Sequence, residues 1–206
     1  MRPKRIPVFP LDVVLLPGMP MPLHIFEPRY KLMIGRCLAE KIEFGMIFAR
    51  ERSISQIGCT AEIVQKVKDY PDGRMDILAE GRAVFRVAEF LDEKEYYEAK
   101  VEYFSENATP QDARLETRLT ELFEQCHTIL LGRAWTDSRR RGDVSLAYQM
   151  AALLPLELNE RQALLEIRDE PARRDFLLQR MAEILPKITH RQTIRRLAGG
   201  NGHGLN

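Results

Sequence analysis

The spacing of hydrophobic positions changes near residue 105. Up to that point, short runs rich in β-branched and aromatic residues alternate with turn signals, a pattern typical of strands. Beyond it, apolar residues recur every three or four positions, which places them on one face of a helix. The pattern predicts a strand-rich domain over residues 1–105 and a helical subdomain over residues 106–198. The glycine-rich end, residues 199–206, is expected to be a flexible tail.

The strand-rich part is predicted to contain seven strands and one helix. The strands are expected over residues 6–9, 23–26, 44–49, 58–67, 74–79, 83–90 and 96–104. Residues 70–73, Tyr-Pro-Asp-Gly, favour a hairpin turn, because Pro presets the first turn dihedral and Gly accepts a positive φ. The three prolines of segment 17–22 indicate a rigid loop, and residues 28–40 have the amphipathic spacing of a helix. Many short strands with one inserted helix predict a small, nearly closed barrel.

Four helices are predicted in the second part from their spacing and end signals. The first three have residues suited to an N-cap at Thr109, Asp143 and Asn159. The fourth is expected over about 171–185, because Pro186 should end it. Helices of this number and length favour a bundle. The predicted fold class is therefore α+β, a β barrel followed by about four helices.

Composition and charge limit the possible functions. Lys and Arg number 31 against 30 Asp and Glu, so wholesale wrapping of nucleic acid is not indicated. No stretch approaches the ~18 apolar residues of a membrane span, and prolines interrupt the apolar N-terminal segment, so we expect a soluble, uncleaved chain with no membrane contact. The three cysteines, Cys37, Cys59 and Cys126, have unrelated spacings, which argues against disulfides and favours the cytoplasm.

Motifs for catalysis and for cofactor binding are missing from the sequence. No glycine precedes a lysine as in a P-loop, no serine lies in a G-x-S-x-G elbow, and no zinc-ligand spacing occurs. We therefore expect no catalytic residue, no cofactor and no metal. His24 and Glu27 are a conceivable acid–base pair, but no nucleophile is adjacent. The simpler expectation is that Glu27 caps the following helix and pairs with a cation.

Candidate binding residues lie in two places. Met19 and Met21 are in the proline-rich loop, where methionines suit adaptable contacts with apolar partners; alternatively, both plug one end of the barrel. Their supporting rim would be formed by His24, Glu27, Arg29 and Tyr30.

Trp135 is the second candidate. It lies between two predicted helices, close to Arg133 and to the run Arg139–Arg141. A tryptophan beside arginines is typical of a protein-binding hot spot, or of a phosphate site with a stacking platform. The favoured alternative is that Trp135 folds back onto the helices while the arginines remain solvated.

The N-terminal sequence blocks resemble a known family. They read Ile-Pro-Val-Phe-Pro-Leu at 6–11, Val-Leu-Leu-Pro-Gly at 14–18, and Pro-Leu-His-Ile-Phe-Glu-Pro-Arg-Tyr at 22–30. Shorter blocks at 44–45, 58–63, 72–74, 80–82 and 85–87 follow in the family's order. Together these blocks closely resemble the N-terminal domain of Lon proteases, most of all its short, stand-alone version in bacteria. The match is strong from residue 5 to about 104; beyond that it is only a helical region.

This resemblance implies a PUA-like pseudobarrel followed by a helical subdomain. In the family this unit recognises substrate or mediates assembly. The ATPase and the peptidase lie downstream of it, and this chain is expected to end before either of them begins. The expected function is a non-catalytic protein-binding module for unfolded or exposed apolar segments, with a protease or a chaperone as further partner. An RNA-binding PUA-like protein is the alternative, although nucleic acid is not the favoured ligand. The oligomeric state stays open.

Overall fold

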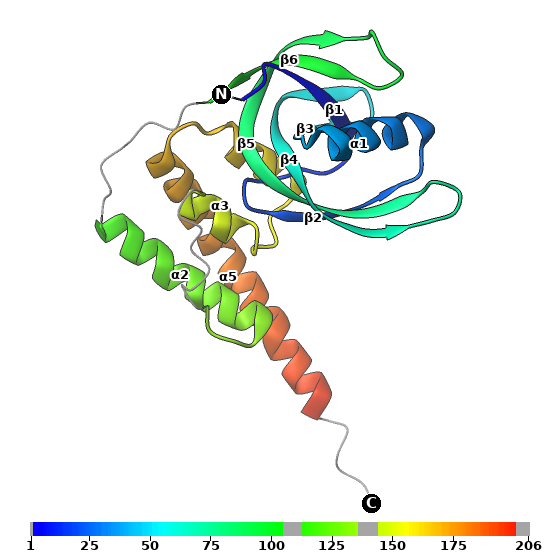
Figure 1. Ribbon diagram of the computed structural model, residues 1–206. Helices are drawn as coiled ribbons and strands as arrows, with labels where there is room; N and C mark the ends of the chain where they lie inside the picture. The colour runs from blue at the N-terminus through cyan, green and yellow to red at the C-terminus, as the bar shows by residue number, and fades with distance from the viewer. Residues whose placement is uncertain (1, 105–112, 136–143, 201–206) are drawn as a thin grey trace, which may run out of the picture.

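The computed structural model describes residues 2–104, 113–135 and 144–200, and the side chains of these residues as far as 194 (Figure 1). Within these ranges the strands come first and most of the helices follow. The strand-rich part contains β1 (Arg5–Leu11), β2 (Pro20–Ile25), α1 (Pro28–Glu40), β3 (Phe44–Arg50), β4 (Ser53–Asp69), β5 (Met75–Leu91) and β6 (Glu98–Tyr103). The helices of the second part are α2 (Ala113–Leu131), α3 (Leu146–Ala151), α4 (Leu158–Glu166) and α5 (Glu170–Gly200). The predicted α+β class is confirmed.

The strands close into a ring. Their order is β2-β5-β4-β3-β1-β6, and β5 also pairs with β6. Closure is possible because β5 is 17 residues long: its first half pairs with β2 and its second half with β6. All pairs are antiparallel except β1 with β3, which run parallel because the connection between them includes α1. Strand β2 remains outside the ring as an edge strand.

Apolar side chains form two core clusters. The smaller one fills the ring and consists of Ile6, Val8, Ile47, Phe85, Val87, Ala99 and Val101. Phe85 fits there because Gly45 and Gly58 have no side chain; a Cβ on either would lie 2.6 or 2.8 Å from its ring. The larger cluster contains the buried face of α1 and continues into the four later helices. Strands and helices therefore share one core.

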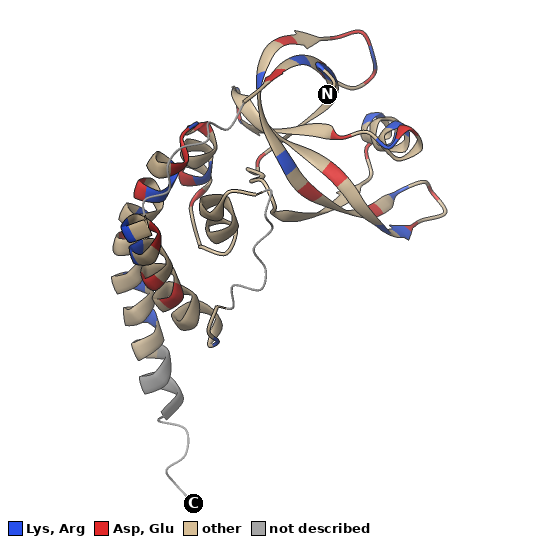
Figure 2. Ribbon diagram, turned by 60° about the vertical axis from the view of Figure 1, so that its left-hand side comes forward, with Lys and Arg blue, Asp and Glu red and all other residues tan. Residues whose placement is uncertain are grey.

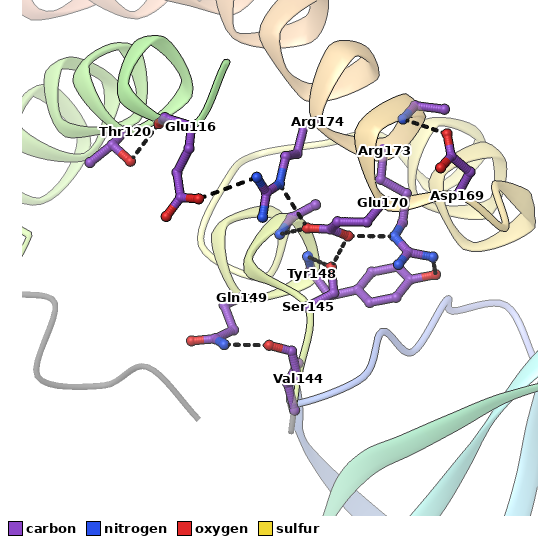
Figure 3. Close-up of polar contacts among 12 residues, drawn as sticks. Glu116, Thr120, Val144, Ser145, Tyr148, Gln149, Asp169, Glu170, Arg173 and Arg174 are labelled. Atoms are coloured by element: carbon purple, nitrogen blue, oxygen red, sulfur yellow. Dashed lines mark hydrogen bonds and ion pairs between the residues drawn. The ribbon is translucent and has the colours of Figure 1, made fainter. Parts of the chain in front are cut away.

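An ion-pair network joins α2, the start of α3 and α5 (Figure 3). At the start of α5, Glu170 accepts hydrogen bonds from Arg173 at 2.9 Å and from Arg174 at 3.1 Å, and also from the hydroxyl of Ser145 before α3. Arg174 reaches Glu116 of α2 at 3.4 Å. Helix α5 then runs beside α2 and extends beyond it toward the C-terminus (Figure 1).

The predicted rigid loop at 17–22 is partly wrong, because residues 20–22 belong to β2. The backbone N–H of Gly81 donates to the carbonyl of Met19 at 3.0 Å, so odd-numbered residues of this segment direct their backbone groups toward β5. Pro20 and Pro22 then have their nitrogens on the open side of the edge strand, where no ladder bond is lost. The prolines in the sequence indicated a loop, but only the strand pairing shows that an edge strand tolerates both Pro20 and Pro22.

Two predicted strands are one element. Residues 74–79 and 83–90 were expected to be separate strands, and both belong to β5. The turn-like residues between them remain extended. A Cβ on Gly81 would lie 2.1 Å from the carbonyl oxygen of Leu16, so the glycine permits a close backbone approach rather than a turn.

Several predicted helix ends differ from the structure. Helix α4 begins before Asn159, and its N-cap is Glu157, whose N–H donates to Glu160 at 2.9 Å. Pro186 lies inside α5, which continues because the next turn buries Ile188 in the shared core. The helix also includes residues 199–200.

Other predictions about the helices lie outside the described residues. Thr109, Asp143 and residues 201–206 are among them, as is the predicted domain boundary at 105/106. Within the described part, the N-cap of α3 is Ser145, whose hydroxyl accepts from the N–H of Tyr148 at 3.4 Å.

Candidate functional site

An apolar pocket on the barrel is the main candidate site. It has a volume of about 180 Å³ and is lined by Val8, Pro10, Ile47, Ile54, Phe90, Leu91, Asp92 and Tyr97. Val8 and Ile47 are fully buried members of the small core cluster, so they form the floor of the pocket. Ile54, Phe90 and Tyr97 are 53%, 45% and 42% exposed and form its rim. We call this site the apolar pocket.

The rim of the apolar pocket comes from three separate segments. Ile54 is near the start of β4, Phe90 near the end of β5, and Tyr97 just before β6. Three large exposed apolar side chains around one hollow are typical of an interaction surface. Among the described residues that line the pocket, Asp92 alone is charged, and it follows Leu91 in the chain.

Sequence reasoning did not find this pocket, although the sequence contains a signal for it. Phe90-Leu91 is an adjacent apolar pair at the end of a predicted strand, where successive side chains point to opposite faces, and Tyr96-Tyr97 is a second adjacent apolar pair. One member of each pair must therefore face solvent. Leu91 and Tyr96 are buried, and Phe90 and Tyr97 are the exposed members.

The loop that carries Asp92 and Tyr97 is attached to the barrel by ion pairs. Arg5 of β1 contacts Glu93 at 2.7 Å, and Lys94 contacts Glu98 of β6 at 3.0 Å. Burial alone raises the pKa of Glu98, but hydrogen bonds from Arg5, Lys94 and Arg36 outweigh it and lower the pKa to about 2. Glu98 thus stays ionised and holds β1, α1 and this loop together.

The structure places the predicted Met19 just before β2 and Met21 within it. Both are half-buried and pack against the shared core. The sulfur of Met19 accepts a 3.6 Å contact from Arg161 of α4, a guanidinium whose pKa is lowered by burial. Met21 pairs with Ala79 of β5. These positions fit the packing alternative, and a role for the two methionines in binding stays a prediction.

His24 pairs with a residue that the sequence reasoning did not consider. Its Nδ1 lies 2.5 Å from Asp76 Oδ1, and the Tyr70 hydroxyl donates to Asp76 Oδ2 at 2.8 Å. These hydrogen bonds from His24 and Tyr70 lower the pKa of Asp76. A His24–Glu27 acid–base couple therefore does not form.

The other predicted rim residues have divided roles. Glu27 occupies the N-cap position of α1, but its side chain caps no N–H; it pairs instead with Arg29 at 2.9 Å. The predicted cation pair is thus confirmed and the side-chain cap is wrong. Tyr30 is buried, with its ring 4.1 Å from that of Phe9, and burial raises its pKa. Of this group, Tyr30 faces the core.

Trp135 packs against the helices. Its ring meets Phe123 of α2 edge-on at 5.2 Å, and the side chain is half-buried on the shared core. This packing matches the alternative in which Trp135 folds back onto the helices. The arginines at 139–141 lie outside the described residues.

Signs of other kinds of site were also sought. Over residues 2–104, 113–135 and 144–200, no three His, Cys, Asp or Glu side chains gather as a metal site needs. In the same ranges, no helix combines the length and the hydropathy of a membrane span. The three cysteines are buried and unpaired, and burial raises the pKa of Cys37 to about 12.

A sequence model of one family matches residues 5–183, and its description is "ATP-dependent protease La (LON) substrate-binding domain". The chain belongs to this family. Lon protease of Escherichia coli K12 is 26% identical over 215 residues, which cover 95% of this chain and 27% of that protein. Lon protease of Erwinia amylovora is 25% identical with the same coverage. The chain thus spans about 27% of the length of these curated relatives.

Solved structures show the same fold. The Lon N-terminal domain protein of Xanthomonas campestris aligns with a TM-score of 0.67 and 23% identity, covering 85% of this chain and 97% of that one. The N-terminal domain of Mycobacterium avium complex Lon protease aligns with a TM-score of 0.62 and 17% identity, covering 87% and 98%. The resemblance drawn from the N-terminal sequence blocks is therefore confirmed.

Proposed function

We propose that this chain is a non-catalytic substrate-binding module that captures exposed apolar segments of other proteins at the apolar pocket. Membership of the Lon substrate-binding family supports the general role. The observation that carries the specific proposal is the rim of Ile54, Phe90 and Tyr97 above a floor continuous with the core. An unfolded protein exposes large apolar side chains that can enter this pocket, whereas a folded protein buries most of its own.

The energetics of the apolar pocket fit transient capture. Burying one large apolar side chain contributes about 1.5–3 kcal/mol. Association costs at least ~4 kcal/mol of lost translational and rotational freedom, so one anchor cannot hold a partner tightly. The rim must therefore contact further residues of the segment. Weak, sequence-tolerant binding is what a module for many unfolded partners needs.

Absence of catalysis is part of the proposal. The sequence contains no P-loop and no serine elbow, and in the described residues His24 is engaged by Asp76 rather than by a nucleophile. Delivery of a captured chain would then depend on a protease or a chaperone. A cytoplasmic location is also proposed, and the three unpaired, buried cysteines support it.

Nucleic acid is not part of the proposal. Figure 2 shows acidic and basic residues interspersed along both the strands and the helices, and the net charge of the chain is +1. A protein that binds RNA through phosphates would present an extended basic face with few acidic residues on it.

The experiment is a binding titration with a permanently unfolded model protein, reduced and carboxymethylated α-lactalbumin, followed by fluorescence anisotropy. Phe90→Ser should weaken binding about tenfold, because it removes one wall of the apolar pocket. The matched control is Phe26→Ser, since Phe26 is 58% exposed and lies outside the pocket lining. Equal affinities for wild type and Phe90→Ser, or equal losses in the two variants, would overturn the proposal.

A further inference from the structure

A second cavity lies where the barrel meets the helices. Its volume is about 230 Å³, and its lining comes from both parts of the chain. Four of the lining residues are arginines, Arg2, Arg82, Arg168 and Arg173, and two carry hydroxyls, Ser145 and Tyr148. No aspartate or glutamate is among the described residues that line it. We call it the arginine cleft.

Carboxylates behind the lining hold three of the arginines in place. The pairs are Arg2–Glu43 at 2.7 Å, Arg82–Glu80 at 2.6 Å and Arg173–Glu170 at 2.9 Å. The last pair is visible in Figure 3, with Ser145 and Tyr148 beside it. Because these partners fix the side chains, the cleft is organised before any ligand arrives, and less ordering is needed on binding.

Arg168 differs from the other three arginines of the cleft in how its charge is balanced. It lies just before α5, and its guanidinium carbon is 4.3 Å from the centre of the Phe104 ring. Among the described residues no carboxylate forms an ion pair with it, and its neighbour Asp169 accepts from the N–H of Ala172 instead. The contact with the face of Phe104 uses the π-face of the ring rather than a hydrogen-bond acceptor, so the N–H groups of Arg168 can donate to an anion.

Arg2 adds further donors. Both of its hydrogen bonds to Glu43 come from a single nitrogen, Nη1, at 3.0 and 2.7 Å. The remaining N–H groups of Arg2 are therefore not used by that carboxylate.

We propose that the arginine cleft binds a phosphate-type oxyanion, either inorganic phosphate or the phosphoryl group of an ester. A planar carboxylate matches one guanidinium fork, whereas a tetrahedral phosphate offers oxygens in several directions, which suits arginines from separate segments around one hollow. Arg168 and Arg2 would donate to the oxygens, and the carboxylate-paired Arg82 and Arg173 would complete the wall of the cleft. This site is independent of capture at the apolar pocket.

The charge balance of the arginine cleft predicts how strongly phosphate binds and how the binding depends on salt. Three arginines are offset by carboxylates, so the attraction depends mainly on Arg168. Affinity for phosphate should therefore be modest and should weaken as salt screens the cleft. Because the lining spans barrel and helices, a bound anion should also raise the melting temperature.

The test uses the full chain and two probes, inorganic phosphate and O-phosphoserine. Binding is followed by calorimetry and by melting temperature, against sodium chloride of equal ionic strength. We expect each probe to stabilise the protein more than chloride does, and Arg168→Gln to weaken both at least tenfold. Tighter binding of phosphoserine would identify an ester as the ligand, and tighter binding of inorganic phosphate a free anion; both results support the site.

Two further variants keep the result interpretable. Arg168→Lys retains a positive charge on a flexible side chain. If Arg168→Gln is folded but does not bind the probes, Arg168→Lys should restore part of the affinity for phosphate. Arg118→Gln removes an exposed arginine of α2 that lines no part of the cleft, and it should bind both probes as the wild type does. Stabilisation no greater than that by chloride, or equal affinity in wild type and Arg168→Gln, would overturn the proposal.

Discussion

The apolar pocket and the arginine cleft are of similar size but are built in opposite ways. The apolar pocket is an extension of the barrel core to the surface, where the ring of strands leaves Phe90 and its neighbours uncovered. The arginine cleft is a junction between two parts of the chain, and its charged side chains are positioned by carboxylates outside the lining. One site therefore depends on the closure of the sheet, and the other on how the helices pack against it.

This difference has a functional meaning. Contacts at the apolar pocket are non-directional, so they suit partners that share only exposed apolar side chains. Contacts at the arginine cleft are charged and directional, so they suit one small ligand of defined geometry. The two surfaces should respond to different substitutions, and four measurements can break or sharpen that contrast.

The largest effect is expected from Glu98→Gln. Glu98 is buried, and the substitution leaves Arg5, Arg36 and Lys94 without their shared anion, so the free energy of unfolding should fall by about 3 kcal/mol. The loop carrying Tyr97 should loosen, which weakens binding at the apolar pocket but not at the arginine cleft. Urea unfolding measures the first effect. Glu89→Gln, which removes an exposed partner of Lys100, should cost less than about 1 kcal/mol.

The pH dependence of stability follows from the same group. The pKa of Glu98 is lowered to about 2 in the folded protein, below its ordinary value. Its stabilising contribution is therefore complete above the ordinary carboxyl pKa and is lost as the pH falls toward 2. Wild type and Glu98→Gln should converge in stability over that range. If the difference in the free energy of unfolding between the two proteins stays constant down to pH 2, the ion pairs of Glu98 contribute nothing to stability.

The next effect concerns Met19→Ser combined with Met21→Ser. Both side chains are half-buried against the larger core cluster, so the double variant should lose about 2–3 kcal/mol of stability. Its affinity for unfolded protein should stay unchanged, as should that of the conservative pair Met19→Leu with Met21→Leu. A stable double serine variant with tenfold weaker binding would make these methionines the capture surface instead of the apolar pocket.

The smallest effect tests whether the two sites are separable. Ile54→Ser with Phe90→Ser should weaken binding of unfolded protein more than tenfold and change phosphate affinity less than twofold. Arg168→Gln should show the reverse. Both are measured by titration of each variant with each ligand. Parallel losses in both variants would indicate a common effect on folding and would remove the contrast between the sites.

Local signals predicted well those elements that need no distant partner. The turn at 70–73 is confirmed, with Gly73 at φ 79° and its N–H donating to Tyr70 at 2.9 Å. Helix 28–40 is confirmed to the residue, because its start depends on Pro28 and its face on regular spacing. The order of strands and helices followed from hydrophobic spacing in the same way, and the family followed from the N-terminal sequence blocks.

Features set by long-range pairing were not predicted. His24 meets Asp76, 52 positions away, only because β2 pairs with β5 in that register. The apolar pocket brings Ile54, Phe90 and Tyr97 together only when the ring closes. A sequence pattern can show that Phe90 and Leu91 point to opposite faces, but it cannot show which of them is exposed or which other residues surround it.

The most direct test of the central claim is to map the contact surface in solution. The protein, labelled with ¹⁵N, would be titrated with a short unfolded peptide rich in leucine and phenylalanine, and amide shifts would be followed by NMR. We predict that the largest changes cluster at residues 8, 47, 54, 90–92 and 97, which line the apolar pocket together with Pro10, a residue without an amide proton. Changes centred instead on residues 19–30, or spread evenly over the chain, would contradict capture at the apolar pocket.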